Sequence, residues 1–283
     1  MSELSARHGA DPGLGYAPAT SDRPFVRLGD DHAGPGSSAV AEEVPVAFVY
    51  GGRPHVVMMS SPADFEDLAV GFTLTEEIVG SVGDIGRVEV ERHSRGVEVR
   101  VDIPEAAVLR LASRARAITG RTGCGLCGVE AIDDAVRSPR VVRAPFLLRE
   151  DSLWRAGAAL EGQQPMHRDT RTVHASAWAT PGGELRFIRE DVGRHNALDK
   201  VIGALARARI DPGGGFLLVT SRASFELVQK AAVAGVPLLA AVSRPTGLAI
   251  RIAEASGITL VGLLRGRSAN VYSHAERLAD GHG

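Results

Sequence analysis

Residues 216–268 have the sequence FLLVTSRASFELVQKAAVAGVPLLAAVSRPTGLAIRIAEASGITLVGLLRGRS, in which short apolar runs alternate with segments of helical spacing. Three of the runs have the length of buried strands, namely Phe216–Val219, Leu238–Val242 and Ile258–Leu264. The segments between them, near 224–234 and 247–256, are predicted helices. A strand–helix–strand–helix–strand order predicts parallel neighbouring strands covered by helices. It places this part of the chain in the α/β class.

Arginine and hydroxyl side chains follow each predicted strand directly. These residues are Ser221 and Arg222, Ser243 and Arg244, and Arg265, Arg267 and Ser268. The carboxyl ends of parallel strands meet at one edge of a sheet, where open α/β sheets bind their ligands. Helices that begin near Ser224 and Thr246 direct free backbone N–H groups toward the same edge. Guanidinium and N–H groups together suit phosphates, so we expect a phosphate-bearing ligand, in particular a nucleotide, rather than arginines that end strands by chance.

The two cysteines of the chain, Cys124 and Cys127, both lie in the segment TGCGLCG at residues 122–128. A C-x-x-C pair has four common interpretations: a zinc site, a thioredoxin-like dithiol, a persulfide carrier, or two incidental buried thiols. The polar and glycine-rich flanks argue against buried thiols. A helix that begins just after Gly128, together with the charge of Arg121, would stabilise a thiolate. We therefore expect reactive thiols, but the motif leaves redox exchange and sulfur transfer both open.

A metal site is not predicted, because a structural zinc ion needs four ligands and the chain has two cysteines. His167, His174 or His195 would have to complete the set, and their spacing is not that of paired ligands. His174 is expected instead to be a packed strand residue. A thioredoxin-like site needs a strand before the cysteines, whereas Pro104–Ile118 is predicted to be a helix. Zinc binding and the thioredoxin fold are therefore both disfavoured.

A dense group of titratable side chains, DVGRHNALDK at residues 191–200, lies where another helix is predicted to begin. In one interpretation His195 transfers protons, and a neighbouring arginine or lysine meets an anion. In the other, Asp191 caps the helix while His195 and Asn196 satisfy buried polar atoms. The two interpretations carry equal weight.

Four regions are expected along the chain: a disordered tail at 1–40, an N-terminal α+β subdomain at 41–120, a mobile C-x-x-C loop with a short helix at 121–139, and an α/β/α subdomain with anion-binding strand ends at 140–277. The tail is rich in Gly, Pro, Ser and Ala without periodicity. In the first subdomain, Val44–Tyr50 and Arg53–Met59 are predicted to form a hairpin. Ser61 and Pro62 then signal the start of a helix.

The bulk composition is that of an ordinary globular protein. The 283 residues carry a net charge of −2, so no general attraction to nucleic acid or to a membrane surface is expected. Two cysteines are too few for a secreted disulfide framework. No signal peptide and no membrane-spanning run is predicted. Together these features predict a cytoplasmic protein.

Several segments together resemble the FdhD family, the sulfurtransferase accessory proteins that formate dehydrogenase activity requires. The resemblance covers roughly residues 44–276, and its motifs are GCGLCG at 123–128, DVGRHNALDK at 191–200, SRASFE at 221–226, SRPT at 243–246, and Arg267 through VYSH at 271–274. The chain departs from the family pattern at Thr170-Arg171-Thr172, where a glycine pair is more usual before the histidine. This departure from the family pattern lies outside the cysteine motif.

The resemblance implies a cytidine-deaminase-like three-layer α/β/α core with a smaller N-terminal α+β part. Deamination itself is not expected, because the H-x-E signature of the zinc deaminases is absent. The segment His174-Ala175-Ser176 lacks the glutamate and follows the cysteines instead of preceding them.

The resemblance also implies an enzyme function, that of a sulfurtransferase. A cysteine desulfurase would load a persulfide onto Cys124, with Cys127 as an auxiliary residue. The sulfur would pass to the molybdenum of a bis(molybdopterin guanine dinucleotide) cofactor, carried as a bound substrate, and so activate formate dehydrogenase. By resemblance the cofactor contacts are Leu263, Leu264, Arg265, Gly266, Arg267 and Ser268, and the strand-end residues Ser221, Arg222, Ser243 and Arg244 line the same expected crevice. The resemblance to this family also implies a homodimer.

Two alternatives remain beside this leading hypothesis. A thioredoxin-like dithiol oxidoreductase would use both cysteines to reduce disulfides. A non-catalytic cofactor chaperone would need the arginines and not the cysteines. The two differ in which residues are essential.

Overall fold

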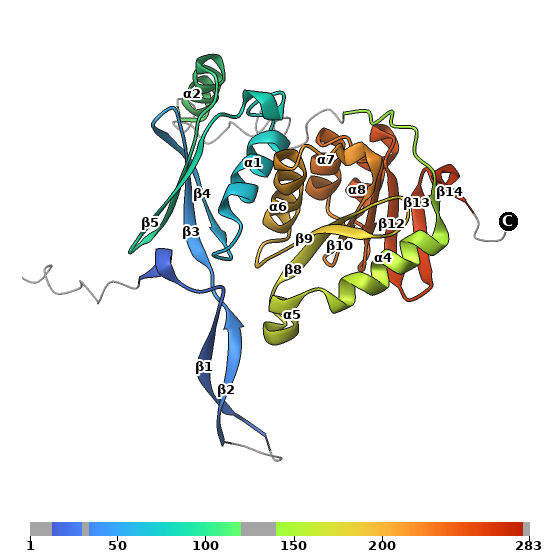
Figure 1. Ribbon diagram of the computed structural model, residues 1–283, viewed down its shortest axis with the longest axis horizontal. Coiled ribbons are helices and arrows are strands. Elements are labelled where there is room, and N and C mark those ends of the chain that lie inside the picture. Colours follow the sequence, from blue (N-terminus) through green and yellow to red (C-terminus); the bar gives the residue numbers. More distant parts are fainter. Residues whose placement is uncertain (1–12, 30–33, 120–139, 280–283) are drawn as a thin grey trace, which may run out of the picture.

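The computed structural model describes residues 13–29, 34–119 and 140–279, which form two main β-sheets with helices packed against each (Figure 1). The larger sheet has the strand order β13-β12-β11-β10-β8-β9. Its strands are β8 (His174–Ala179), β9 (Leu185–Asp191), β10 (Phe216–Val219), β11 (Leu238–Ala241), β12 (Thr259–Arg265) and β13 (Ser268–Ser273). The predicted parallel pairing of β10, β11 and β12 is confirmed, and β8 and β13 flank them in antiparallel register.

Helices cover both faces of this sheet because its strands are apolar on both sides. Helices α6 (Arg194–Arg207), α7 (Phe225–Val233) and α8 (Gly247–Ser256) pack on one face, and α4 (Glu150–Gly162) packs on the other. Within β10, Leu217 and Val219 join the first core, while Phe216 and Leu218 join the second, as the alternation of a strand requires. The predicted mixed α/β class is confirmed, and the likeness to cytidine deaminases stays a prediction.

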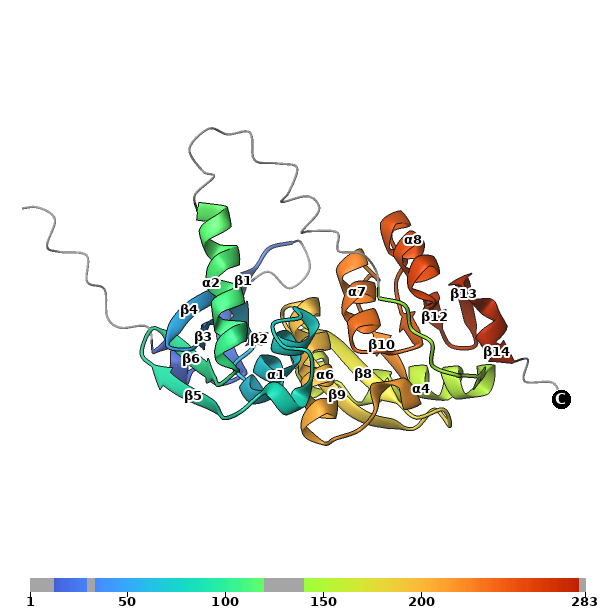
Figure 2. The same cartoon turned by 90° about the horizontal axis from the view of Figure 1, so that it is seen from above.

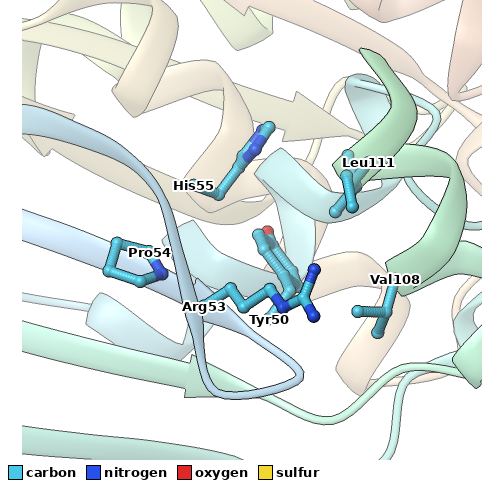
Figure 3. A pocket seen from close by; sticks show the side chains of 7 residues that line it. Tyr50, Arg53, Pro54, His55, Val108 and Leu111 are labelled. Carbon is cyan, nitrogen blue, oxygen red and sulfur yellow. The ribbon is translucent and has the colours of Figure 1, made fainter. Parts of the chain in front are cut away.

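The smaller sheet has the strand order β4-β3-β6-β5. Its strands are β3 (Val44–Tyr50), β4 (Arg53–Ser60), β5 (Val88–His93) and β6 (Gly96–Val101), and the helices beside it are α1 (Phe65–Thr75) and α2 (Glu105–Thr119). Alternate residues of β3, such as Val46 and Phe48, pack with Leu68 of α1. The turn between β3 and β4 lies so close to α2 that a side chain on Gly51 would meet Val108 (Figure 3).

Short elements connect these layers. They are η2 (Val82–Asp84), β7 (Leu148–Arg149), α5 (Pro165–Thr170), η3 (Pro212–Gly214), η4 (Ala275–Arg277) and β14 (Leu278–Ala279), with β7 paired to β14. The expected loop and short helix at 121–139 lie outside the described residues. None of the helices in the described ranges is long and apolar enough to cross a membrane.

The expectation of a disordered tail at 1–40 is wrong for the part that the structure describes. Strands β1 (Thr20–Arg27) and β2 (Gly34–Ala41) form a regular antiparallel hairpin that projects from the body (Figure 1). The short helix η1 (Leu14–Tyr16) precedes this hairpin and packs against the β5–β6 hairpin. The contact at Gly15 is so close that a Cβ there would overlap the backbone of His93. This segment is ordered because the backbones of its two strands are hydrogen-bonded to each other, and the amino-acid composition does not indicate such pairing.

The two sheets are joined where α1 crosses α6 (Figure 2). A Cβ on Gly71 would overlap the backbone of Asp199, and one on Gly203 would overlap the backbone of Asp67. The missing side chains therefore let the two helix backbones approach closely. Beside this crossing, the buried Asp67 carboxylate binds Arg189, with an Nη2–Oδ2 distance of 2.6 Å, and also Arg207.

Replacement of Gly203 by alanine tests this contact. Gly203→Ala is expected to destabilise the protein by about 1–3 kcal/mol, because the steric overlap outweighs the better helix propensity of alanine. Urea denaturation measures the change. Gly162→Ala is the matched control, since a Cβ on Gly162 meets nothing within 4 Å. Equal effects of the two substitutions would contradict the close crossing.

Candidate functional site

The segments that follow β10, β11 and β12 meet at one edge of the larger sheet. We call this edge the arginine rim and define it as residues 221–224, 243–246 and 263–268. Thr246 N donates to Ala223 O at 3.1 Å, and Leu263 N donates to Ser243 O at 3.1 Å. The three segments are thus bonded to one another in series. The structure brings together all the strand-end residues that the sequence singled out, and their role in ligand binding stays a prediction.

The end of β12 has an irregular backbone that shapes the arginine rim. Leu263 has a φ of 56°, in the left-handed region, and the register with β13 shifts between Gly262 and Arg265. A Cβ on Gly262 would lie 2.8 Å from Pro245 Cδ, so the strand presses against the segment after β11. Leu264 is buried against α4, so its side chain belongs to the core and only its backbone is available to a ligand.

Four exposed arginines line the arginine rim, namely Arg222, Arg244, Arg265 and Arg267. Arg267 pairs with Asp151 of α4 at 2.8 Å. Within the described part of the chain, the other three guanidinium groups make no hydrogen bond or ion pair. Ser221 is buried and donates through its hydroxyl to Arg222 O at 3.0 Å, which fixes the backbone there. The arginine rim therefore presents unpaired positive charge, which suits an anionic ligand.

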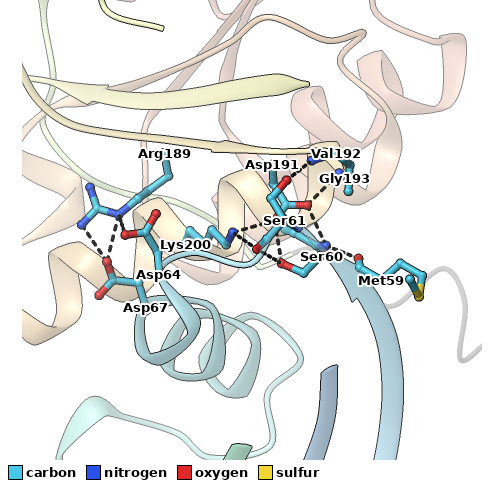
Figure 4. Close-up of polar contacts among 11 residues, drawn as sticks. Met59, Ser60, Ser61, Asp64, Asp67, Arg189, Asp191, Val192, Gly193 and Lys200 are labelled. Atoms are coloured by element: carbon cyan, nitrogen blue, oxygen red, sulfur yellow. Dashed lines mark hydrogen bonds and ion pairs between the residues drawn. The ribbon is translucent and has the colours of Figure 1, made fainter. Parts of the chain in front are cut away.

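Next to the arginine rim, the Asp191 carboxylate organises the start of α6 (Figure 4). It has no solvent exposure, and its Oδ2 accepts hydrogen bonds from Ser60 Oγ at 2.6 Å and from Lys200 Nζ at 2.6 Å. Its Oδ1 accepts from Gly193 N at 2.8 Å and from Asn196 Nδ2 at 3.0 Å. Asp191 and Asn196 thus satisfy buried polar groups, which favours the structural interpretation for these two residues. The expectation that Asp191 caps the helix is wrong in one respect, because the N-cap residue of α6 is Gly193.

His195 lies at the edge of this cluster and contacts Glu226 of α7, with 3.2 Å between Nε2 and Oε2. Burial lowers the pKa of His195, and the Glu226 carboxylate partly offsets the effect. His174 is the half-buried first residue of β8, and burial followed by the charges of Arg194, His167 and Arg222 lowers its pKa. Burial thus favours the neutral form of both imidazoles, and a proton-transfer role for His195 stays a prediction.

The residues expected to carry sulfur, Cys124 and Cys127, lie outside the described residues, as does Arg121. Their position relative to the arginine rim stays a prediction. Within residues 13–29, 34–119 and 140–279, no group of three or more His, Cys, Asp or Glu side chains could hold a metal ion.

Several residues of the site were not found from the sequence. The sequence predicts Ser61 as a helix cap, but the N-cap residue of α1 is Asp64. Ser61 instead contacts the Asp191 loop, where its hydroxyl accepts from Val192 N and its N–H donates to Asp191 Oδ2. Lys230 of α7 is buried against Asp199, at 2.9 Å. The one available signal was the pair Asp199-Lys200 on an otherwise apolar helical face, which indicates buried charges that need partners.

Removal of the Asp191 charge tests its organising role. Asp191→Asn is expected to cost about 3–5 kcal/mol of unfolding free energy, because Lys200 is left buried without a counter-charge. Urea denaturation measures this loss. The double variant with Lys200→Met is expected to recover much of it, since an apolar side chain of similar length replaces the buried ion. No recovery in the double variant would mean that the hydrogen bonds of Asp191, and not the ion pair, dominate.

The pH response of His195 tests its surroundings. Its folded-state pKa is expected below 6.5, so the unfolded state binds the proton more readily. Stability then rises with pH between the folded pKa and about 6.5, and His195 contributes no further change above it. NMR titration of the ring protons measures the pKa directly. Glu226→Gln is expected to lower it further, because Glu226 stabilises the imidazolium; a pKa above 6.5 would contradict this environment.

Comparison with known proteins connects the fold and the site to a family. A model of the FdhD/NarQ family matches residues 41–279. The sulfur carrier protein FdhD of Xanthomonas axonopodis pv. citri is 50% identical over 239 residues, covering 84% of this chain and 85% of that one. The protein of the same name from Bordetella petrii is 49% identical over 253 residues, covering 89% and 91%.

A solved structure shares the fold. It is a formate dehydrogenase accessory protein from Desulfotalea psychrophila, with a TM-score of 0.73 and 23% sequence identity, and the match covers 93% of this chain and 100% of that one. At this identity the likeness shows the fold alone. The family model and the relatives at about 50% sequence identity show the family as well as the fold: the chain described here belongs to the FdhD/NarQ family.

Proposed function

We propose that this protein is a sulfurtransferase that carries sulfur from a cysteine desulfurase to a bis(molybdopterin guanine dinucleotide) cofactor and so activates formate dehydrogenase. One observation carries the proposal. The chain has just two cysteines, both in one C-x-x-C motif, and its relatives at about 50% identity are named sulfur carriers. Any sulfur chemistry of this chain through cysteine must therefore use Cys124 or Cys127.

The chemistry begins with a thiol–persulfide exchange. The Cys124 thiolate attacks the outer sulfur of the desulfurase persulfide, which leaves the desulfurase as a thiolate and Cys124 as a persulfide. In the second step the Cys127 thiolate attacks the inner sulfur of that persulfide. The outer sulfur departs as hydrosulfide for the cofactor, and Cys124 and Cys127 form a disulfide. The two thiols supply the electron pair that reduces the transferred sulfur, and an external thiol must then reduce the disulfide.

The arginine rim is proposed to hold the cofactor as cargo. Its exposed, unpaired Arg222, Arg244 and Arg265 offer guanidinium forks that match phosphate oxygens. The segment 263–268 contributes the backbone of its bulged strand and the turn at Gly266, where φ is 56° and a Cβ would meet nothing within 4 Å. Cytidine-deaminase-like layering and a homodimer are part of the same proposal.

The arginine rim also supports one alternative, a cofactor chaperone that performs no sulfur chemistry. The two functions differ in one requirement: the carrier needs Cys124, whereas the chaperone needs only the arginine rim. A dithiol oxidoreductase would need both cysteines and no cofactor. The three can therefore be separated by substitution.

Replacement of Cys124 is expected to abolish activation. In a cell without its own copy, Cys124→Ala should reduce formate oxidation to the level of the empty vector, because no persulfide can form. Intact mass spectrometry after incubation with a cysteine desulfurase and cysteine should show one added sulfur on the native chain and none on Cys124→Ala.

The matched variant is the double substitution Arg265→Gln and Arg267→Gln. It is expected to gain sulfur normally but to activate poorly, because only cargo binding is weakened. Full activation by a chain in which both cysteines are replaced by alanine would exclude the carrier and favour the chaperone. Disulfide reductase activity that does not depend on the arginines would favour the oxidoreductase.

A further inference from the structure

A cavity of about 260 Å³ lies in the N-terminal part of the molecule, between the start of β4 and helix α2 (Figure 3). One side is formed by the β3–β4 hairpin and the other by the helix. The lining residues are Tyr50, Arg53, Pro54 and His55 from the hairpin, and Val108, Leu111 and Ala112 from α2. This volume suits a small molecule of roughly a dozen non-hydrogen atoms. The cavity lies on the smaller sheet, and no residue of the arginine rim lines it.

A β-bulge gives the cavity its shape. Phe48 pairs with Val56, whereas Val49 pairs with Pro54, which leaves His55 as the extra residue in β4. Bulges of this kind redirect a side chain and recur beside functional sites. The His55 ring meets Tyr50 edge-on, with 5.6 Å between ring centroids, and lies 6.4 Å from Phe72. The bulge therefore adds a polar, planar side chain to an otherwise apolar wall.

The base of the cavity is neutral and rigid. The Tyr50 ring is buried, and its hydroxyl is 2.8 Å from Thr73 Oγ1, so the hydroxyl already has a partner. Burial also raises the pKa of Tyr50, which keeps the phenol uncharged. On the opposite wall, the aliphatic side chains of Val108 and Leu111 face the hairpin (Figure 3). A flat apolar group would find contacts on both sides.

Arg53 places one positive charge at this cavity. Its side chain is exposed, and it makes no hydrogen bond or ion pair within the described part of the chain. None of the seven lining residues is acidic. A guanidinium group next to apolar walls selects a ligand with a carboxylate at one end and an apolar body at the other.

We propose that this cavity binds a small aromatic carboxylate, whose ring packs between Leu111 and His55 and whose carboxylate is held by Arg53. The inference goes beyond sulfur transfer and does not rest on it. The ligand class follows from one cation, aliphatic and aromatic side chains on the two walls and a volume of about 260 Å³. Helix α2 forms one wall and ends at Thr119, shortly before Cys124 in the sequence.

Titration of the full chain with phenylacetate tests the proposal, with saturation-transfer difference NMR as the readout. Saturable binding is expected. Phenylacetamide, which has the same shape without the charge, should bind at least about fivefold more weakly, and Arg53→Gln should weaken phenylacetate binding by about five- to tenfold. Ala112→Leu should block binding, because the larger side chain fills the slot.

Arg95→Gln is the control, since Arg95 is likewise an exposed arginine and lies in the β5–β6 turn, at the opposite end of the smaller sheet. It should leave binding unchanged. Circular dichroism melts check that each variant is folded. The proposal is overturned if phenylacetate, benzoate and indole-3-acetate all fail to saturate, if the amide binds as well as the acid, or if Arg53→Gln and Arg95→Gln behave alike.

Discussion

The Asp191 carboxylate and the Lys200 ammonium form an ion pair without solvent exposure, 2.6 Å apart. Such a pair gains little over an apolar contact by itself, because both charges lose their hydration. Its value here is geometric, since the same carboxylate also binds Ser60 and Ser61 at the end of β4 and Gly193 and Asn196 at the start of α6. Each donor fixes a different segment. The smaller sheet, the larger sheet and the first turn of α6 beside the arginine rim are therefore held by one group.

A second and a third set of buried charges repeat this arrangement along the α1–α6 crossing. Asp67 of α1 binds Arg189 and Arg207, while Asp199 of α6 binds Lys230 of α7. Burial raises the pKa of Asp199, and the adjacent Lys230 charge opposes that rise. Charged side chains at a helix crossing restrict the relative rotation of the helices more than apolar contacts do, since each bond has a preferred direction. These ion pairs tie α1 to β9 and α6, and α6 to α7, the helix that begins at the arginine rim.

Apolar runs and the residues that follow them in sequence were sufficient to predict the parallel strands of the larger sheet and the edge at which they end. The apolar runs at β10, β11 and β12 have strand length, and the arginines that follow them came together because parallel strands end at one edge. The β1–β2 hairpin was missed, because its Gly, Pro and Ser residues mask a backbone register that is complete from Thr20 to Arg27. The contact of Asp191 with Ser60 and that of Asp67 with Arg189 were missed because the partners lie more than a hundred residues apart, where periodicity carries no information. No pattern indicated the bulge at His55, since it depends on pairing.

These long separations also bear on how the chain folds as it is synthesised. Ser60 lies 131 residues before Asp191. At typical ribosomal rates, the smaller sheet waits on the order of ten seconds for α6 to emerge. During that interval the surface of α1 around Gly71, which packs against the backbone of α6 in the folded protein, has no partner. Nascent chains of this protein should accordingly present that surface to chaperones until the second half has been translated.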